Sequence, residues 1–247
     1  MLIRVINPNT SAPMTAAIGA AAARVAAPGT RIDCVSPAMG PASIEGHYDE
    51  AIATVGLLEE IRAGELLGAA GHVVACFGDP GLDAAREIAR APVIGVAEAA
   101  MHLATLVATG FSVVTTLERT CIITEHLVHN YGFTRQCRAI RACEIAVLEL
   151  EHPGSGAYER IEDECRRALR EDRSGAIVLG CAGMAELRDR LQAALGVPVV
   201  EGVTAAVKLL EGLAALGLAT SRHGDYAAPL AKPYAGLMAR FAPGGSS

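Results

Sequence analysis

Two cysteines occupy matching settings in the two halves of the sequence, and a pair of thiols can carry out proton chemistry. Cys76 lies in the segment VACFG (residues 74–78), and Cys181 lies in the segment LGCAG (residues 179–183). A thiolate is a base and a thiol is an acid, so two such groups on opposite faces of an acidic carbon can remove one proton and supply another. One isolated cysteine is most simply a core residue, but a matched pair is harder to explain by packing.

The residues after Cys76 predict a turn into a helix. Asp79 suits the N-cap of that helix and Pro80 suits its first position. Backbone N–H groups at a helix N-terminus stabilise negative charge, so we expect them to lower the pKa of the Cys76 thiol. Gly78 allows backbone amides to face a ligand, and the small residues around Cys181 leave a similar opening.

Polar residues follow an early strand-like segment in each half. The segment NPNTS (residues 7–11) comes after the first apolar run, and Thr115 and Thr116 come at the end of another. Their amide and hydroxyl groups, with those of Asn9 foremost, are suited to binding an oxyanion that develops on a substrate. The alternative for the first of these segments is a plain helix cap without a ligand.

Strand-like and helix-like segments alternate along the chain, which predicts parallel sheets covered by helices. With no Trp and only four Phe, the core must be largely aliphatic, as suits buried parallel strands. The predicted strands are residues 2–6, 31–35, 73–76, 93–96, 112–115, 138–142, 176–180 and 199–201. The predicted helices are residues 11–26, 49–69, 81–90, 97–109, 120–131, 158–172, 184–195 and 204–217. The proline-containing end predicts a final turn or short helix on the first half.

The second half of the sequence repeats the first. A helical segment and PVIGV (residues 92–96) follow Cys76, and a helical segment and PVVEG (residues 198–202) follow Cys181. Two similar α/β halves usually face each other across a cleft, and open parallel sheets bind ligands at the carboxyl ends of their strands. We therefore predict two pseudo-symmetric, Rossmann-like halves with the active site between them. The predicted halves are residues 1–97 with 205–247, and residues 98–204.

Composition and the absence of several motifs exclude some classes of function. The chain of 247 residues has a net charge of −6 and no run of Lys or Arg, so a nucleic-acid partner is disfavoured. No apolar stretch is long enough to span a bilayer, and the first residues lack the pattern of a signal peptide. No dinucleotide fingerprint follows the first strand and no Walker loop appears. We expect a cytoplasmic protein that acts on a small molecule.

The remaining thiols and the histidines do not predict a metal site. The chain has seven cysteines, an odd number, and no secretion signal, which together indicate reduced thiols. No C-x-x-C motif occurs. His126 and His129 share a predicted helix face but lack further ligands. The cysteines expected to be structural are Cys34, Cys121, Cys137, Cys143 and Cys165.

Segments spread along the chain resemble a known family. They are INPNT (residues 6–10), SIEGH (43–47), ACFGDPGL (75–82), LGCAGM (179–184) and VTAAVK (203–208). In this order they resemble the aspartate/glutamate/hydantoin racemase superfamily, and within it the hydantoin racemases, with allantoin racemases beside them. The resemblance implies two pseudo-symmetric flavodoxin-like halves, no cofactor and two catalytic cysteines, which match Cys76 and Cys181.

The resemblance also implies a substrate class. We expect racemisation of 5-monosubstituted hydantoins, allantoin included, by two-thiol proton transfer at ring carbon C5. We also expect a homo-oligomer. The predicted substrate-binding residues are Asn9, Ser43, Phe77, Gly78, Asp79, Thr115, Thr116, Ala182 and Gly183.

Two other kinds of function stay open at this stage. The same scaffold could serve an aspartate- or glutamate-type racemase or a maleate isomerase, although no clear cationic clamp for a free carboxylate is seen. A decarboxylase of the arylmalonate type is disfavoured because it would need only one cysteine. A non-catalytic small-molecule binding protein with the same two-lobed shape would bind hydantoin-like ligands and keep doing so without either thiol.

Overall fold

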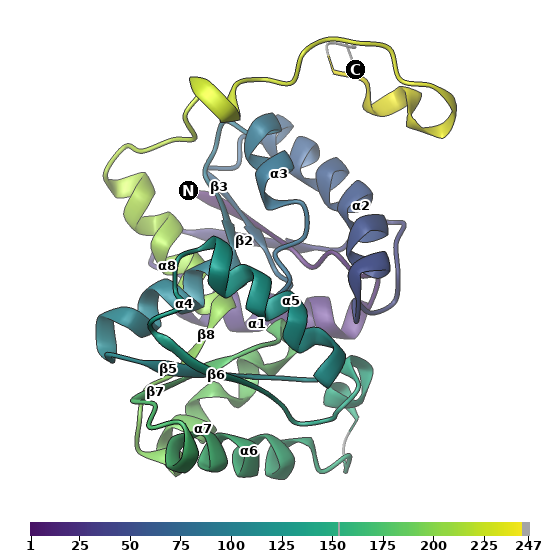
Figure 1. The fold of residues 1–247 in the computed structure, drawn as a ribbon. Coiled ribbons are helices and arrows are strands. Elements are labelled where there is room, and N and C mark those ends of the chain that lie inside the picture. Colours follow the sequence, from purple (N-terminus) through teal and green to yellow (C-terminus); the bar gives the residue numbers. More distant parts are fainter. Residues whose placement is uncertain (153, 244–247) are drawn as a thin grey trace.

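A computed structural model describes residues 1–152 and 154–243 of the chain. It contains two four-stranded sheets in which all the described strand pairs are parallel. Helices flank both sheets, which form the upper and lower parts of the molecule in Figure 1. The predicted α/β fold with two parallel-sheet halves is confirmed.

The first sheet has the strand order β2-β1-β3-β4. Its strands are β1 (Leu2–Ile6), β2 (Arg31–Val35), β3 (Gly71–Val74) and β4 (Val93–Gly95). The helices that follow these strands are α1 (Ala12–Val25), α2 (His47–Leu66), α3 (Leu82–Ile88) and α4 (Val96–Val107). Strands β1 and β3 are buried along their whole length, as expected of the central strands of a parallel sheet, with Arg4 and His72 as the buried polar residues among their otherwise apolar side chains.

The second sheet has the equivalent strand order β6-β5-β7-β8. Its strands are β5 (Phe111–Thr115), β6 (Cys137–Ala142), β7 (Ala176–Leu179) and β8 (Val199–Glu201). Its helical segments are α5 (Glu118–Asn130), η1 (Val147–Glu151), α6 (Ala157–Glu171), η2 (Ala182–Leu187), α7 (Arg188–Leu195) and α8 (Gly202–Ala215). The helix predicted at 184–195 thus begins as a 3-10 helix, η2, and the 3-10 helix η1 was not predicted.

The strand register brings the two thiol-bearing turns to equivalent edges. In the first sheet, Ile6 lies opposite both Val35 and Val74, so the residues after these strands leave the sheet at one edge. In the second sheet, Val114 lies opposite Leu179. The segments that end at these edges are residues 7–11, 75–79, 115–117 and 180–183. They carry the polar residues and thiols singled out from the sequence.

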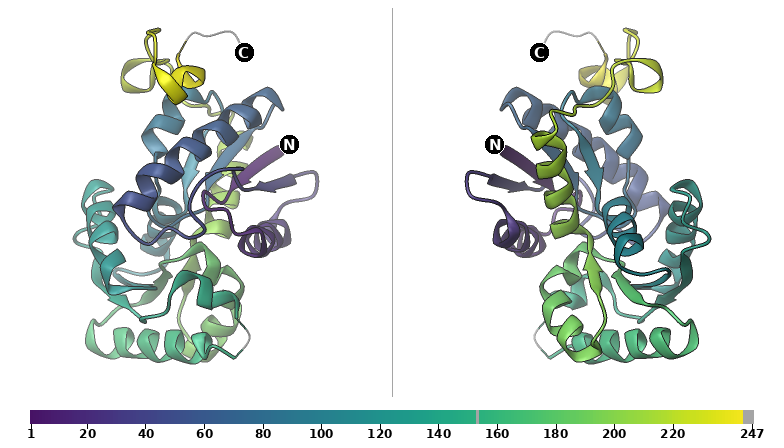
Figure 2. Two further views of the ribbon diagram at one scale, coloured as in Figure 1. Left: turned by 90° about the vertical axis from the view of Figure 1, so that its right-hand side faces the viewer. Right: turned by 90° about the vertical axis from the view of Figure 1, so that its left-hand side faces the viewer.

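The helices α4 and α8 exchange sides between the two sheets. Helix α4 follows β4 of the first sheet but packs against β7 and β8 of the second. Helix α8 follows β8 of the second sheet but packs against α1 and β3 of the first, as Figure 2 shows for the yellow-green helix. The two helices also pack against each other, where a Cβ atom on Gly202 would lie 2.1 Å from the carbonyl oxygen of Val96.

This exchange of helices bears on where the chain divides. Because α4 packs with the second sheet and α8 with the first, we propose the division predicted from the sequence. The two units are residues 1–97 with 205–243, and residues 98–204. Residues 244–247, which the prediction assigned to the first unit, lie outside the described residues, as does residue 153 in the second.

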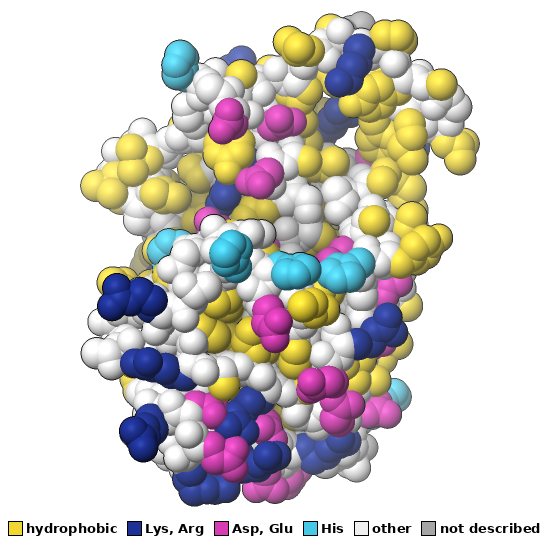
Figure 3. Space-filling model, viewed as in Figure 1, with side chains coloured by type: hydrophobic (Ala, Val, Ile, Leu, Met, Phe, Trp, Pro, Cys, Tyr) yellow, Lys and Arg dark blue, Asp and Glu magenta, His cyan; other side chains and the backbone are white. Residues whose placement is uncertain are grey.

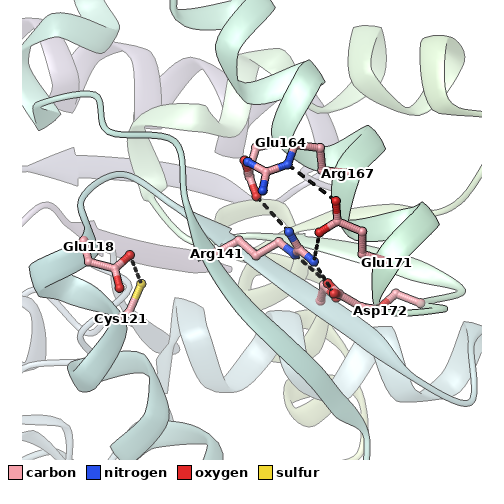
Figure 4. Close-up of polar contacts among 9 residues, drawn as sticks. Glu118, Cys121, Arg141, Glu164, Arg167, Glu171 and Asp172 are labelled. Atoms are coloured by element: carbon pink, nitrogen blue, oxygen red, sulfur yellow. Dashed lines mark hydrogen bonds and ion pairs between the residues drawn. The ribbon is translucent and has the colours of Figure 1, made fainter.

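Arginine side chains tie neighbouring elements to each sheet. In the first half, the buried Arg4 of β1 pairs with Asp33 of β2 and Glu60 of α2. In the second half, Arg141 of the edge strand β6 reaches the carboxylates of α6 and the residue after it. These partners are Glu164 at 3.2 Å, Glu171 at 2.8 Å and Asp172 (Figure 4). The long guanidinium arms therefore join a sheet to a covering helix in both halves.

The chain ends in a segment that docks on the first half and then leaves it. The 3-10 helix η3 (Gly224–Tyr226) packs on α3, and Arg222 donates to the carbonyl of Ala89 at 2.9 Å. The C-terminal arm (residues 227–243) stands away from the body in Figures 1 and 2 and contains η4 (Gly236–Phe241). It returns to α2, where Arg240 pairs with Glu59 at 2.6 Å. Among the described helices, none is long and apolar enough to cross a membrane.

Candidate active site

A small cavity of about 50 Å³ lies where the carboxyl edges of the two sheets face each other. A volume of this size gives room for a few water molecules. Cys76 and Cys181 both line it. The other predicted residues along its wall are Asn9, Phe77, Gly78, Thr115, Thr116, Ala182 and Gly183. Of the predicted set, Ser43 and Asp79 are not part of the described lining.

Cys76 follows the buried strand β3 and is partly accessible from the cavity. The backbone N–H of Gly78 donates a hydrogen bond to its sulfur, as the glycine turn predicted. The expected lowering of its pKa is wrong, however. Burial raises the pKa of the Cys76 thiol and outweighs this one amide, and the charges of Cys181, Glu50 and Asp79 act in the same direction as burial. The resting group is therefore a thiol.

Cys181 follows β7 and stands at the N-cap position of the 3-10 helix η2. Its backbone carbonyl accepts a hydrogen bond from the N–H of Met184 at 3.1 Å, which begins that helix. Gly180 allows the strand end to lie against β5, because a Cβ atom there would be 2.9 Å from the Cα atom of Thr115. Gly183 lies beside the thiol, with its ideal Cβ position 3.6 Å from the sulfur.

The polar residues after β1 and β5 are held in place by one another. The side-chain oxygen of Asn9 accepts hydrogen bonds from Asn7 Nδ2 at 2.8 Å and from the N–H of Ser11 at 2.9 Å. Its amide nitrogen lies 3.3 Å from the sulfur of Met14, which is a weak acceptor. Thr115 donates to the carbonyl oxygen of Gly180 at 3.0 Å and so fixes the strand that carries Cys181.

Asp79 is turned away from the cavity. This corrects two expectations, namely that Asp79 binds substrate and that it caps the helix after Cys76. Its carboxylate accepts hydrogen bonds from the N–H groups of Ala97 at 3.1 Å and Glu98 at 2.9 Å, and from the Tyr131 hydroxyl at 2.8 Å. It therefore caps α4, whereas α3 begins at Leu82 without a side-chain cap. Burial raises the pKa of Asp79 to about 7 despite these hydrogen bonds. The backbone at Asp79 has a φ of 44°, in the left-handed region that few residues other than glycine adopt.

Several residues that line the cavity were not in the predicted substrate-binding set. Glu50 on the first turn of α2 is the charged one, and Ile44, rather than its neighbour Ser43, contributes from the loop before that helix. The others are Asn7, Met14, Ala75, Thr120, Ile123, Thr124, Val147 and Gly180. Asn7 follows strand β1 and belongs to the segment 7–11 that was singled out as suited to binding an oxyanion, although the predicted substrate-binding set named only Asn9 of that segment. Glu50 carries no such signal, because it lies on a helix far from either thiol in sequence.

The five cysteines expected to be structural are held as thiols. Burial raises the pKa of Cys34 to about 12 and of Cys143 to about 11. Cys34 donates to the carbonyl of Thr15 at 3.2 Å and Cys143 donates to that of Thr115 at 3.1 Å. Burial likewise raises the pKa of Cys121, Cys137 and Cys165. None of the seven cysteines, all of which lie in the described part of the chain, forms a disulfide.

The fold and the cavity define a two-lobed α/β protein with one thiol from each lobe at a shared site. Comparisons with known proteins identify its family. The sequence pattern of the Asp/Glu/hydantoin racemase family matches residues 3–210. The chain is 49% identical to a hydantoin racemase of Rhizobium meliloti, over 96% of this chain and 98% of that one. It is 46% identical to a hydantoin racemase of Pseudomonas sp., over 98% of this chain and 97% of that one.

A solved structure is similar over nearly the whole length. The allantoin racemase from Klebsiella pneumoniae has a TM-score of 0.96 and 60% sequence identity, covering 98% of this chain and 99% of that one. The chain belongs to the Asp/Glu/hydantoin racemase family. The predicted family and the predicted enzyme class, an isomerase of the racemase type, are both confirmed.

Proposed function

We propose that the protein racemises 5-monosubstituted hydantoins, a class that includes allantoin, by proton transfer between two thiols and ring carbon C5, without a cofactor. The observation that carries the proposal is the position of Cys76 and Cys181. They follow the equivalent strands β3 and β7, and both line the same cavity between the sheets. The similarity to hydantoin and allantoin racemases supports the same substrate class.

The chemistry needs one base and one acid on opposite faces of C5. A thiolate at one cysteine takes the C5 proton, and the electron pair left on carbon moves into the neighbouring carbonyl to give an enolate. The thiol at the other cysteine then gives its proton to the opposite face of C5, so the two sulfurs exchange protonation states. Backbone amides near Gly78 and Gly183 and the hydroxyl of Thr116 are suited to binding the enolate oxygen.

Burial of the Cys76 thiol favours this step once its thiolate has formed. Because burial raises the pKa of Cys76, its thiolate is a stronger base than a thiolate in water. A weakly acidic C–H group requires such a base. The two sulfurs act on each other electrostatically, so their protonation belongs to the pair rather than to either residue.

The proposed activity is tested with single enantiomers. Purified protein, without added metal, pyridoxal phosphate or nicotinamide, should abolish the optical rotation of at least one of L-allantoin, D-allantoin or a 5-alkylhydantoin faster than a no-enzyme control. Aspartate, followed by optical rotation, tests the amino-acid racemase. Maleate, followed by proton NMR for the appearance of fumarate because both are achiral, tests the maleate isomerase. Turnover of either of these with none of any hydantoin would overturn the proposal.

A non-catalytic binding protein is the other alternative to distinguish. It would protect its thiols from alkylation when a hydantoin is present but would leave optical rotation unchanged. It would also bind as well after Cys76→Ser or Cys181→Ser. The proposed racemase should instead turn over the hydantoin that protects its thiols.

We also propose that the protein self-associates and works in the cytoplasm. Support for self-association comes from the C-terminal arm, where Leu230 and Leu237 are 82% and 91% exposed. Support for a reducing compartment comes from the odd number of seven cysteines. Light scattering after size-exclusion chromatography should give a mass above one chain, and Leu230→Ser with Leu237→Ser should lower it. A monomer at all concentrations would contradict the proposed self-association.

A further inference from the structure

Glu50 is a carboxyl group inside the candidate active site that the two-thiol reaction does not use. It lies in the first turn of α2, and its side chain is 17% exposed. It lines the cavity with both thiols, and its charge disfavours the thiolate form of Cys76. Its carboxyl group therefore faces the space in which a substrate would bind.

Gly78 makes room for this carboxyl group. A Cβ atom on Gly78 would lie 2.0 Å from Oε1 of Glu50, so any other residue at this position would displace the carboxyl. The same glycine gives its N–H to the sulfur of Cys76. The turn after β3 thus brings a thiol, a backbone amide and a carboxyl oxygen from another element to one corner of the cavity.

The contacts of Glu50 do not anchor it to the fold. In the described structure its ion-pair partner is His47, at 3.5 Å, and the His47 side chain is 64% exposed. The His47 ring in turn stacks on His126 of α5 at 6.2 Å, and Figure 3 shows a row of histidine side chains across this face of the molecule. By contrast, Asp49 beside it accepts a backbone N–H, from Glu45, as a structural carboxylate would.

We infer that Glu50 determines specificity: it selects neutral rings that bear N–H groups and excludes ligands with a free carboxylate. This inference rests on the proposed function and adds the charge of the substrate to it. An ionised carboxyl accepts a hydrogen bond from an amide N–H, and a protonated one can donate to a carbonyl; a hydantoin edge offers both. The described lining of the cavity includes no Lys or Arg that could neutralise a second negative charge.

The electrostatics of the site agree with this role. Burial raises the pKa of Glu50, while His47 and His126 lower it and Asp49 raises it. In a cavity of about 50 Å³, a carboxylate ligand would lie close to this group in surroundings of low polarity. The ligand carboxylate and the Glu50 carboxylate would repel each other strongly, so binding would require one of them to take up a proton.

The test compares two ligands that differ only in charge. Hydantoin-5-acetic acid is an anion at neutral pH, and hydantoin-5-acetamide is its neutral counterpart of nearly equal size. The readout is protection of Cys76 and Cys181 from iodoacetamide, followed by mass spectrometry. In the unmodified protein we expect the amide to give half-protection at a concentration at least about 10-fold lower than the acid.

Three variants make the comparison decisive. Glu50→Gln keeps the size and should bring the two half-protection concentrations within about 2-fold, mainly by improving the acid. Glu50→Asp keeps the charge and should keep most of the discrimination. Glu59→Gln, on the same helix outside the cavity, is the matched control and should leave the ratio unchanged. Thermal unfolding of each variant checks that the fold is intact.

The outcomes separate this inference from the function on which it rests. If both ligands protect, hydantoins are racemised and Glu50→Gln leaves the ratio as it was, Glu50 does not set the charge preference and only this inference falls. An equal change in Glu59→Gln has the same consequence. If no hydantoin protects either thiol or is racemised, the proposed function fails and this inference fails with it.

Discussion

The turns after β3 and β7 present equivalent thiols on different supports. In the repeat, Cys76 corresponds to Cys181 and Asp79 corresponds to Met184. Asp79 is a buried polar residue that reaches across to cap α4, whereas Met184 is fully buried in the apolar core of the second half. The turn that carries Cys76 is therefore supported by a hydrogen-bonded carboxylate, and the turn that carries Cys181 is supported by close-packed apolar side chains.

The same difference appears where α4 and α8 begin. Gly95 and Glu201 are the equivalent N-cap residues of these helices. The Glu201 carboxylate accepts from the N–H groups of Val203 at 2.7 Å and Thr204 at 2.8 Å. A Cβ atom on Gly95 would lie 2.2 Å from Cγ of Asp79, so the Asp79 carboxylate fills the place that Glu201 fills in its own half. A carboxylate therefore caps the equivalent helix in both halves, but it comes from Glu201 at the N-cap itself in one half and from the more distant Asp79 in the other.

The largest expected effect tests whether the two thiols are functionally equivalent. Cys76→Ser and Cys181→Ser should each lower the racemisation rate by at least about 10³-fold, because serine is a far weaker acid than cysteine. Each variant should still exchange the C5 proton of one enantiomer for deuterium, and the two should prefer opposite enantiomers. Proton NMR in heavy water, against a no-enzyme control, measures this. A preference for the same enantiomer would mean that the sulfurs do not flank C5.

The next effect concerns the seam where the two halves meet. Gly202→Ala should lower the free energy of unfolding by about 3 kcal/mol, since the added methyl group would overlap the backbone carbonyl of Val96. Gly212→Ala in the same helix is the control: its Cβ position has no neighbour within 4 Å, so a gain of about 0.5 to 1 kcal/mol is expected. Urea unfolding measures both. Equal effects of the two variants would show that close approach at the seam is unimportant.

A smaller effect distinguishes the two caps by pH. Burial raises the pKa of Asp79 from its usual 3.8 to about 7, so the folded protein binds more protons than the unfolded chain between these values. The stability that Asp79 contributes is therefore full below about pH 4 and is lost as pH rises through about 7. Asp79→Asn should remove this slope and should cost more stability at pH 5 than at pH 8. Urea unfolding at both pH values checks the sign, and a larger cost at pH 8 would contradict it.

The smallest effect compares the glycines after the two thiols. Gly78→Ala should displace the end of the Glu50 side chain and raise the KM for a hydantoin by about 3- to 10-fold, the loss of one hydrogen bond. Gly183→Ala should change KM less, because its Cβ would meet the flexible ends of Leu150 at 3.2 Å and Met14 at 3.4 Å and would lie at ordinary contact distance, 3.6 Å, from the Cys181 sulfur. Both thermal midpoints should stay close to that of the parent. A larger KM change in Gly183→Ala would show that substrate binding is more sensitive to an added methyl group beside Cys181 than beside Cys76.

Most of the fold could be predicted because its signals are local. Buried parallel strands require largely apolar runs such as residues 176–180 and residues 2–6, where Arg4 is the exception, and the repeat pairs PVIGV with PVVEG. The two thiols could be found for the same reason, since equivalent positions in a repeat end at equivalent sheet edges. The five structural cysteines lacked a counterpart of this kind.

What could not be predicted depends on contacts between distant elements. Asp79-Pro80 has the local pattern of a helix start, yet the carboxylate caps α4, which begins 17 residues later at Val96. A positive φ at Asp79 redirects it, and no local rule signals that. Glu50 enters the cavity because α2 packs beside the turn at Gly78, a tertiary arrangement that helix periodicity does not encode. Ser43 was predicted to bind substrate because it belongs to the family-like segment 43–47. The residue of this segment that lines the cavity is Ile44.

The direct passage from strand to helix at Gly95–Val96 and at Glu201–Gly202 has a thermodynamic consequence. No linker residue separates β4 from α4 or β8 from α8, and both junctions lie inside capped helix starts. Opening the two lobes at the first junction would have to break the cap from Asp79 to the start of α4, so we expect substrate to enter through the short segments around the cavity mouth. The lobes then keep nearly the same conformational entropy throughout turnover. The temperature dependence of the rate should accordingly report the activation enthalpy of carbon deprotonation, and solvent viscosity should have little influence on it.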